Sequence, residues 1–243
     1  MIDRNSLFFL LSSLLVINLA AQERIAILAY GSLVKRPKHS VTGARLCAAK
    51  FAPTPLSFPI SLSSLAHKNR ITAVIDSRYG ISKRVWAAAS NFNSFDHAIQ
   101  NLAAREGAAF IKKEKKYDTQ YIFYIRKLGA DEILNKQERL LNKSDNWVIR
   151  EDPDGRQRLS EDTIACIAEW AKKNKFDAVL WVSCPIVPLS SDAFIIRLLE
   201  DPVMLSNAQG YVKLFADGAQ TELERAIIGG KSALMKLMRA RKE

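Results

Sequence analysis

The stretch Ile25-Ala26-Ile27-Leu28-Ala29-Tyr30-Gly31-Ser32-Leu33 is the starting point for interpreting this chain, because its apolar run stops abruptly at Tyr-Gly-Ser. An apolar run closed by glycine is typical of a buried strand that ends in a turn. Glycine has no Cβ atom, so the backbone of such a turn is able to approach a ligand closely. We therefore expect a strand over 24–30 and candidate ligand-binding groups at Tyr30, Gly31, Ser32 and Leu33.

A second candidate group is the carboxylate of Glu106. Phe95, Ile99, Leu102 and Glu106 recur at helical spacing, which puts the acid on the apolar face of a predicted helix. Gly107 is a natural helix end, so Glu106 falls in the last turn, where exposed carbonyl groups repel negative charge. Burial and the helix end both predict a raised pKa for Glu106, toward the range that suits a general base.

Each of these features also has a simpler interpretation. A Tyr-Gly-Ser sequence after a strand is, on its own, most often a turn in which glycine relieves backbone strain. An acid near the end of an apolar helix face is more often half exposed, or paired with an arginine such as Arg105 or Arg126, than catalytic. Both interpretations stay open at this point.

Several motifs follow one another in a distinctive order. They are Tyr30-Gly31-Ser32-Leu33, Arg70-Ile71-Thr72-Ala73-Val74-Ile75-Asp76, Val85-Trp86-Ala87 and Ala98-Ile99-Gln100-Asn101-Leu102-Ala103-Ala104-Arg105-Glu106-Gly107. In this order and spacing they resemble the gamma-glutamylcyclotransferase-like superfamily, and the chain looks like one of its less characterised bacterial branches. The similarity is strongest from Ile25 to Arg126 and continues more loosely through 177–181 toward the C-terminus.

The resemblance implies an enzyme that cyclises a gamma-glutamyl compound. The substrate's own alpha-amine attacks its gamma-carbonyl, which gives 5-oxoproline and releases an amine, amino acid or peptide. By the same resemblance, Glu106 takes a proton from that amine, and the turn from Tyr30 to Leu33 holds the substrate through backbone groups. Because the nucleophile belongs to the substrate, we expect no metal ion, cofactor or covalent enzyme nucleophile.

Two further residues near the motifs are weaker candidates for substrate binding. Arg70 offers a planar fork of donors suited to a substrate carboxylate, and Tyr121 offers a hydroxyl hydrogen. Arg36 and Tyr30 offer the same chemistry. A surface role remains the more common one for such arginines.

The composition leaves a second class of function open. The formal net charge is +11 and the pI is about 9.6, which favours anionic partners such as small ligands, membranes or nucleic acid. Lys112-Lys113-Glu114-Lys115-Lys116 and the basic segment 231–242 support the alternative of a non-catalytic binding protein for an anionic ligand or nucleic acid. No aromatic residue interleaves with these charges, so nucleic acid is the less favoured partner.

The first residues pose a separate question. The segment from Leu7 to Ala21 is apolar and is followed by polar residues 22–24, a pattern typical of a secretory signal peptide over 1–21. It is short for a membrane span, so no stable span is expected after processing. Export to the periplasm is favoured over a cytoplasmic location, with an N-terminal extension or a misassigned start as the alternatives. Residues 22–243 are expected to form one domain with a divergent, helical C-terminal part.

The cysteines and histidines give no sign of a metal site. Cys47, Cys166 and Cys184 are widely spaced in apolar neighbourhoods and are predicted to be buried thiols. The three histidines, His39, His67 and His97, do not form a helix-spaced ligand set, so structural zinc is not expected.

The remaining periodicity predicts an α+β protein. The expected elements are a hairpin of 71–76 and 85–90 around Tyr79-Gly80, helix 94–106 capped by Ser94, strand 121–125, helix 131–142, helix 160–173 capped by Ser160, strand 178–183, and helices with breaks at Pro202, Gly210 and Gly229-Gly230. The resemblance sharpens this to a mixed closed sheet or barrel, with flanking helices and the site at one mouth.

Overall fold

The structure is a computed structural model that describes residues 22–35, 38, 43–64, 71–142, 146–150, 159–182, 191–215 and 220–242. Several predictions fall outside these residues. They are the signal peptide over 1–21, the substrate contacts of Arg36 and Arg70, the histidines His39 and His67, and the thiol of Cys184.

A mixed sheet of eight strands forms the body of the protein, with the order β3-β2-β4-β1-β10-β7-β9-β8. Its strands are β1 (Ile25–Ala29), β2 (Ala52–Ser64), β3 (Ile71–Ile75), β4 (Ile81–Ala89), β7 (Ile122–Lys127), β8 (Glu138–Asn142), β9 (Trp147–Arg150) and β10 (Ala178–Val182). β1 and β10 run parallel, whereas the other neighbours in the sheet are antiparallel. A separate hairpin consists of β5 (Phe110–Ile111) and β6 (Lys116–Tyr117).

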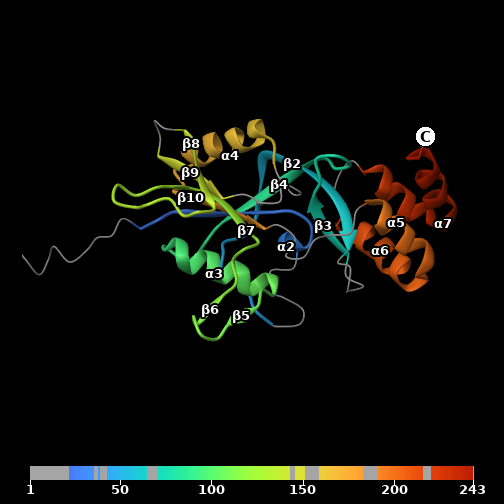
Figure 1. The fold of residues 1–243 in the computed structure, drawn as a ribbon, viewed down its shortest axis with the longest axis horizontal. Coiled ribbons are helices and arrows are strands. Elements are labelled where there is room, and N and C mark those ends of the chain that lie inside the picture. The colour runs from blue at the N-terminus through green and yellow to red at the C-terminus, as the bar shows by residue number, and fades with distance from the viewer. Residues whose placement is uncertain are drawn as a thin grey trace, which may run out of the picture.

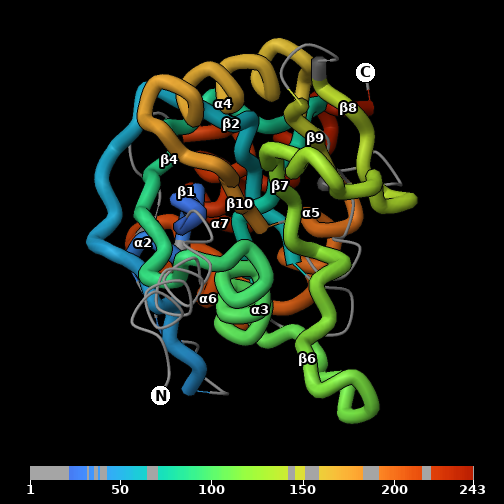
Figure 2. The backbone as a smooth tube through the Cα atoms, turned by 90° about the vertical axis from the view of Figure 1, so that its left-hand side faces the viewer, coloured from blue at the N-terminus to red at the C-terminus, as the bar shows by residue number. Residues whose placement is uncertain are grey.

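The predicted first strand is confirmed as β1, which lies at the centre of the sheet and is buried on both faces. Ala26 and Leu28 point into a cluster with Trp181 under α4 (Glu161–Lys173), whereas Ile25 and Ile27 point into a cluster under α3 (Phe95–Glu106). The two helices cover opposite faces of the sheet (Figures 1 and 2). This two-sided burial is why the strand reads as a continuous apolar run in the sequence.

The helices predicted over 94–106 and 160–173 are confirmed. Ser160 caps α4 as expected, because its hydroxyl accepts a hydrogen bond from the Thr163 amide at 3.2 Å. Ser94 stands at the N-cap position of α3 in extended conformation, but its side chain makes no capping hydrogen bond. The start of α3 is instead held by the Glu23 carboxylate, which accepts from the Phe95 amide at 2.6 Å.

Three C-terminal helices gather at one end of the molecule (Figure 1). They are α5 (Ser191–Glu200), α6 (Pro202–Phe215) and α7 (Glu222–Ala240), and they enclose a third apolar cluster to which Leu62 of β2 and Ile71 of β3 contribute. The predicted break at Pro202 is confirmed, since α6 begins there. The predicted break at Gly210 is wrong, because this glycine lies inside α6.

α7 contains the predicted break at its paired glycines. Gly230 has φ 76° and ψ −163°, which no helix can contain. A straight helix of 19 residues would separate its ends by about 28 Å. Here the break lets the chain fold back, so Arg241 lines the same cleft as Leu223 near the helix start.

The hairpin predicted around Tyr79-Gly80 is wrong, because β2 lies between β3 and β4. Ile60 of β2 pairs with Ile75 on one edge and with Ile81 on the other. Apolar segments that are neighbours in the sequence normally favour pairing with each other, but β2 is long enough to pair with both β3 and β4. Its proline-rich half pairs with β4 and its last residues pair with β3.

The helix predicted over 131–142 is also wrong. The segment begins with turns and ends as strand β8, which pairs with β9. Its apolar residues are not buried as the helical pattern required, since Ile133 is 91% exposed. The strand is held instead by Glu138, whose carboxylate binds two side chains of β7.

The α+β class is confirmed, but the expected closure of the sheet is not found among the described strands. β3 and β8 lie at the two edges of the order and do not pair with each other. β3 packs instead against the C-terminal helices, through Ile71 and Ala73. Among the described helices, none is both long and apolar enough to cross a membrane.

An ionic network joins β7 to β8. Glu138 has a side chain only 1% exposed, and its carboxylate accepts from Arg126 Nε at 3.0 Å and from the Tyr124 hydroxyl at 2.8 Å. Burial acts to raise the pKa of Glu138, but the hydrogen bonds from Arg126, the Asn135 amide and Tyr124 lower it below its ordinary value. Burial and the same hydrogen bond raise the pKa of Tyr124 to about 12.

The substitution Glu138→Gln is expected to lower the free energy of unfolding at neutral pH by about 2–3 kcal/mol, because it removes the more deeply buried of two carboxylates that bind Arg126. A depressed pKa means that this stability is present above the unfolded value of about 4.3 and is lost as the pH falls through the folded value. Urea unfolding should therefore show a difference in the free energy of unfolding between parent and variant that becomes smaller at acidic pH. The exposed Glu169→Gln is the matched control, expected to change stability by less than about 0.5 kcal/mol. A gap that does not depend on pH would contradict the assigned ionisation.

The break in α7 is expected to require glycine. Gly230→Ala should destabilise the protein by about 1–3 kcal/mol through backbone strain alone, since an added Cβ atom meets nothing within 4 Å. Gly210→Ala is the matched control, because its Cβ is equally unobstructed but lies inside a helix, where alanine is favoured by up to about 1 kcal/mol. Thermal unfolding should move the two midpoints in opposite directions. Equal shifts would show that α7 does not need the break.

Candidate functional site

The predicted site lies at the end of the sheet where β1 and β10 finish and β7 begins. β1 and β10 are parallel, so Ala29 and Val182 end on the same side, and Ile122 at the start of β7 pairs with Val182. α3 starts beside the start of β1, because the Glu23 amide donates to the Asn93 carbonyl at 3.2 Å. The helix then runs along the sheet toward the far end of β1 (Figure 1).

The Tyr-Gly-Ser turn and the end of α3 are linked by one apolar cluster. Gly31 adopts φ 64°, and the chain then forms the single helical turn α2 (Ser32–Lys35). Leu33 is 5% exposed and packs in the same cluster as Leu102 and Ala103 of α3. The side chain of Leu33 therefore belongs to the core, and only the backbone of this residue is a candidate for ligand binding.

Glu106 is the last residue of α3, as predicted, and Gly107 ends the helix. Gly107 has φ 76°, and its amide donates to the carbonyls of Ala103 and Ala104. The side chain of Glu106 is 18% exposed, whereas that of Arg105 is 3% exposed. The side chain of Glu106 is thus mostly enclosed, with a part of it open to solvent.

Arg105 and Glu106 form an ion pair, with 2.5 Å between Arg105 Nη1 and Glu106 Oε1. This confirms the arginine pairing that the simpler interpretation of Glu106 included. A buried guanidinium favours the charged form of the carboxylate, which opposes the effect of burial on which the sequence argument relied. It also fixes the direction in which the carboxylate points.

The two tyrosines of the prediction lie at this same end of the sheet, but Tyr30 is engaged elsewhere. Its ring packs edge-on against Phe58, in the cluster under α4, and its hydroxyl donates to the Val182 carbonyl at 2.6 Å. Tyr30 therefore joins β1 to β10, and its hydroxyl hydrogen is used within the protein. Tyr121 is half-buried and directly precedes β7.

No pattern in the sequence indicated that α6 reaches this turn. An added Cβ atom on Gly31 would lie 2.9 Å from Tyr211 Oη and 3.1 Å from Ala73 Cβ. Lys35 Nζ donates to the Leu214 carbonyl, near the end of α6, at 2.6 Å. Because Tyr211 lies far downstream in a segment of only loose resemblance, no local pattern singles it out.

The two described cysteines differ in exposure. Cys166 is exposed, so its predicted burial is wrong: it lies on the solvent side of α4. Cys47 is half-buried. In the part of the chain that the structure describes, no group of His, Cys, Asp and Glu side chains is arranged to hold a metal ion.

Comparison with known proteins found no match to this chain among protein-family models, curated proteins or solved structures. Function is therefore inferred from the residues at this end of the sheet and from the order of the motifs.

The close approach of α6 makes Gly31 a sensitive position. Gly31→Ala is expected to cost about 2–4 kcal/mol of stability, because alanine is disfavoured at φ 64° and its methyl group meets Tyr211. Adding Tyr211→Phe removes the contacting oxygen and should recover the part of the steric cost that Tyr211 causes. The backbone strain of about 1–2 kcal/mol and the contact with Ala73 Cβ then remain. Urea unfolding of both single variants and the double variant measures the coupling. Strictly additive effects would show that Tyr211 does not contact the turn.

Proposed function

We propose that this protein is a gamma-glutamylcyclotransferase-like enzyme, which converts a gamma-glutamyl compound to 5-oxoproline and releases an amine, amino acid or peptide. One observation supports the proposal above the others: the carboxylate of Glu106 and the backbone of the turn at Gly31 lie at the same end of the sheet, joined by a common cluster. The order of the motifs supports the same reaction. In this proposal the sheet of this protein is open where the sheet of the superfamily is closed, and the C-terminal helices pack beside β3.

The reaction requires the protein mainly to position the substrate and one proton acceptor. The substrate's ammonium group gives a proton to Glu106, and the free amine attacks the gamma-carbonyl carbon of the same molecule. As the bond to the leaving nitrogen breaks, Glu106 passes that proton to it. The attacking nitrogen gives up its second proton, again through Glu106, to the released amine, so that 5-oxoproline carries a neutral lactam N–H and the amine leaves as an ammonium. Because the attack is intramolecular, holding one folded conformer of the substrate is able to contribute on the order of 7–11 kcal/mol in ideal cases.

The other groups of the site have supporting roles in this proposal. The amides of Gly31, Ser32 and Leu33 donate to the oxyanion that develops on the gamma-carbonyl, and they need no reorganisation to do so. Arg105 pairs with the carboxylate of Glu106 and orients it before the substrate arrives. Arg70 and Tyr121 are the proposed partners of the substrate's own carboxylate.

Glu106→Gln is expected to reduce the rate of 5-oxoproline formation by about 10²–10⁴-fold, because an amide does not accept the proton. The assay uses a panel of gamma-glutamyl amino acids, glutathione and gamma-glutamyl amines, with 5-oxoproline as the readout. Glu114→Gln is the matched control, since this acid is 52% exposed and pairs with Lys116 outside the site. It should retain the parent's activity.

A loss of activity must be distinguished from a loss of folding, because Glu106→Gln removes a charge that pairs with the buried Arg105. Glu106→Asp keeps the charge and moves it, so it should keep more stability than the Gln variant while still losing turnover. Thermal unfolding of both variants provides the comparison. An active Gln variant would refute Glu106 as the base, and an inactive parent on the whole panel would refute the proposed activity.

One observation supports the second candidate function, non-catalytic binding of an anionic polymer. The β5–β6 hairpin carries four exposed lysines, Lys112, Lys113, Lys115 and Lys116. Phe110, 51% exposed, packs edge-on against Tyr117 at its base, with 5.1 Å between ring centroids. The sequence places no aromatic residue between these charges, but the pairing of β5 with β6 sets Phe110 opposite Tyr117 at the base of the hairpin. Aromatic faces next to lysines suit the binding of single-stranded nucleic acid. A parent protein that forms no 5-oxoproline from any substrate of the panel would favour this candidate.

A further inference from the structure

A cleft lies between the β3–β4 connection and the folded-back helix α7, separate from the site at Glu106. Its volume is about 460 Å³, within the range of small-molecule sites. The residues that line it are Arg78, Tyr79, Gly80, Ile81, Ser82, Gln220, Glu222, Leu223, Arg225 and Arg241. Three of these are arginines that come from three different parts of the chain.

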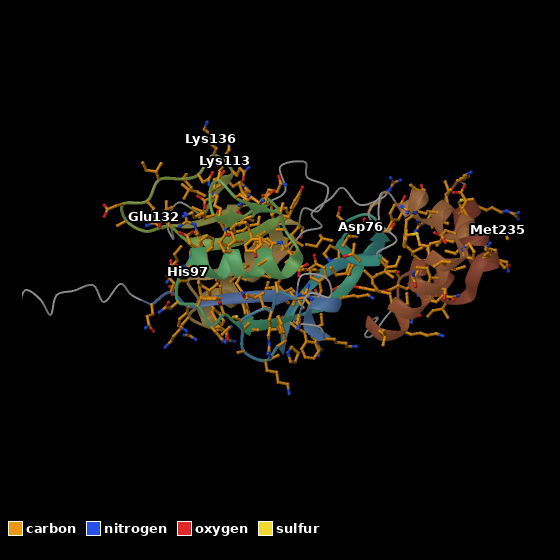
Figure 3. All side chains as sticks on the ribbon, turned by 90° about the horizontal axis from the view of Figure 1, so that it is seen from below. Asp76, His97, Lys113, Glu132, Lys136 and Met235 are labelled. Carbon is orange, nitrogen blue, oxygen red and sulfur yellow. The ribbon has the colours of Figure 1, made fainter. Side chains whose placement is uncertain are left out.

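One wall of the cleft is a tightly held turn. The carboxylate of Asp76 accepts hydrogen bonds from the amides of Arg78 and Tyr79, each at 3.0 Å, and the Gly80 amide donates to the Asp76 carbonyl at 2.9 Å. An added Cβ atom on Gly80 would lie 2.6 Å from the carbonyl carbon of Pro59, so the turn rests directly on β2. Figure 3 shows Asp76 where the sheet meets the C-terminal helices, with Met235 on their outer side.

The opposite wall is the start of α7, which is anchored to the sheet. Thr221 and Glu224 form a reciprocal capping box. The carboxylate of Glu224, 2% exposed, also binds Lys83 Nζ at 2.6 Å. The amide of Glu224 is satisfied by Thr221, whereas the amides of Glu222 and Leu223 have no acceptor within the helix and lie at its positive end.

The third wall depends on the break at Gly230, which returns the end of α7 to its start. The side chain of Arg241 is 12% exposed, and its guanidinium lies 4.3 Å from the centre of the Tyr79 ring. The guanidinium of Arg78 lies 4.9 Å from the same ring. Tyr79 thus contacts two guanidinium groups, which are attracted to the electron-rich face of its ring.

Among the described residues, Glu222 is an acid that lines the cleft, and Asp192 Oδ1 lies 3.4 Å from Arg241 Nη1. Arg225 uses one nitrogen on the Gln220 carbonyl at 2.6 Å and keeps its other donors. Guanidinium groups are always protonated and match the geometry of phosphate oxygens in pairs.

We propose that this cleft binds a small phosphate-bearing anion, held by Arg78, Arg225 and Arg241. The amides at the start of α7 add donors of the kind that phosphate groups accept. This site is separate from the proposed cyclotransferase site, because none of the described residues assigned to that reaction lines the cleft.

Isothermal titration of the full chain with pyrophosphate tests the proposal. We expect saturable binding with one equivalent, weakened about tenfold or more by Arg225→Gln, because a hydrogen bond to a charged group is lost. Arg239→Gln, an exposed arginine of α7 outside the cleft, is the matched control and should leave binding unchanged. Lys113→Gln on the β5–β6 hairpin should also leave it unchanged.

Three results would overturn the proposal. They are a parent that shows no saturable binding, an Arg225→Gln variant that binds like the parent, and equal weakening by Arg239→Gln or Lys113→Gln, which would indicate attraction to the general surface charge. Titration with citrate provides the chemical comparison. Binding of citrate as tight as that of pyrophosphate would refute the preference for phosphate.

Arg225 is exposed, so its replacement is compatible with folding, and circular dichroism of the variant verifies this.

Discussion

The parallel pairing of β1 with β10 is the constraint on which the rest of the structure depends. All five residues of β1 are buried, and each fully buried Ile or Leu contributes about 1.5–3 kcal/mol relative to an exposed one. A strand with two apolar faces needs a helix on each, which α3 and α4 provide. Parallel pairing also makes β1 and β10 end together, so the Gly31 turn, Val182 and the start of β7 share one end of the sheet.

The C-terminal helices have two effects on this arrangement. They cover β3 and the last residues of β2, which leaves the described sheet open where the resemblance implied closure. They also bring Tyr211 against the Gly31 turn and Arg241 against the β3–β4 connection. The buried ion pair between Lys83 and Glu224 fixes the start of α7 to the sheet, because neither charge is stable there without the other.

The elements that were predicted correctly carry strong local signals. β1 is a continuous apolar run, α3 has regular helical spacing and a glycine end, and α4 begins with a serine cap. The errors share a different cause. The hairpin at Tyr79-Gly80 failed because β2 pairs with both neighbours, and the helix over 131–142 failed because Glu138 is held by Arg126 and Tyr124 across strands. Neither contact is visible in a window of adjacent residues.

By itself, the sequence determined the α+β class, the buried strand with its glycine turn, and the position of Glu106 at the end of an apolar helix face. These follow from periodicity and from the backbone preferences of glycine, which act over a few residues. Only the tertiary structure decided the strand order, the reach of Tyr211 to Gly31 and the meeting of three arginines in one cleft. Those depend on contacts between segments far apart in the chain, which burial of apolar surface selects and local pattern does not encode.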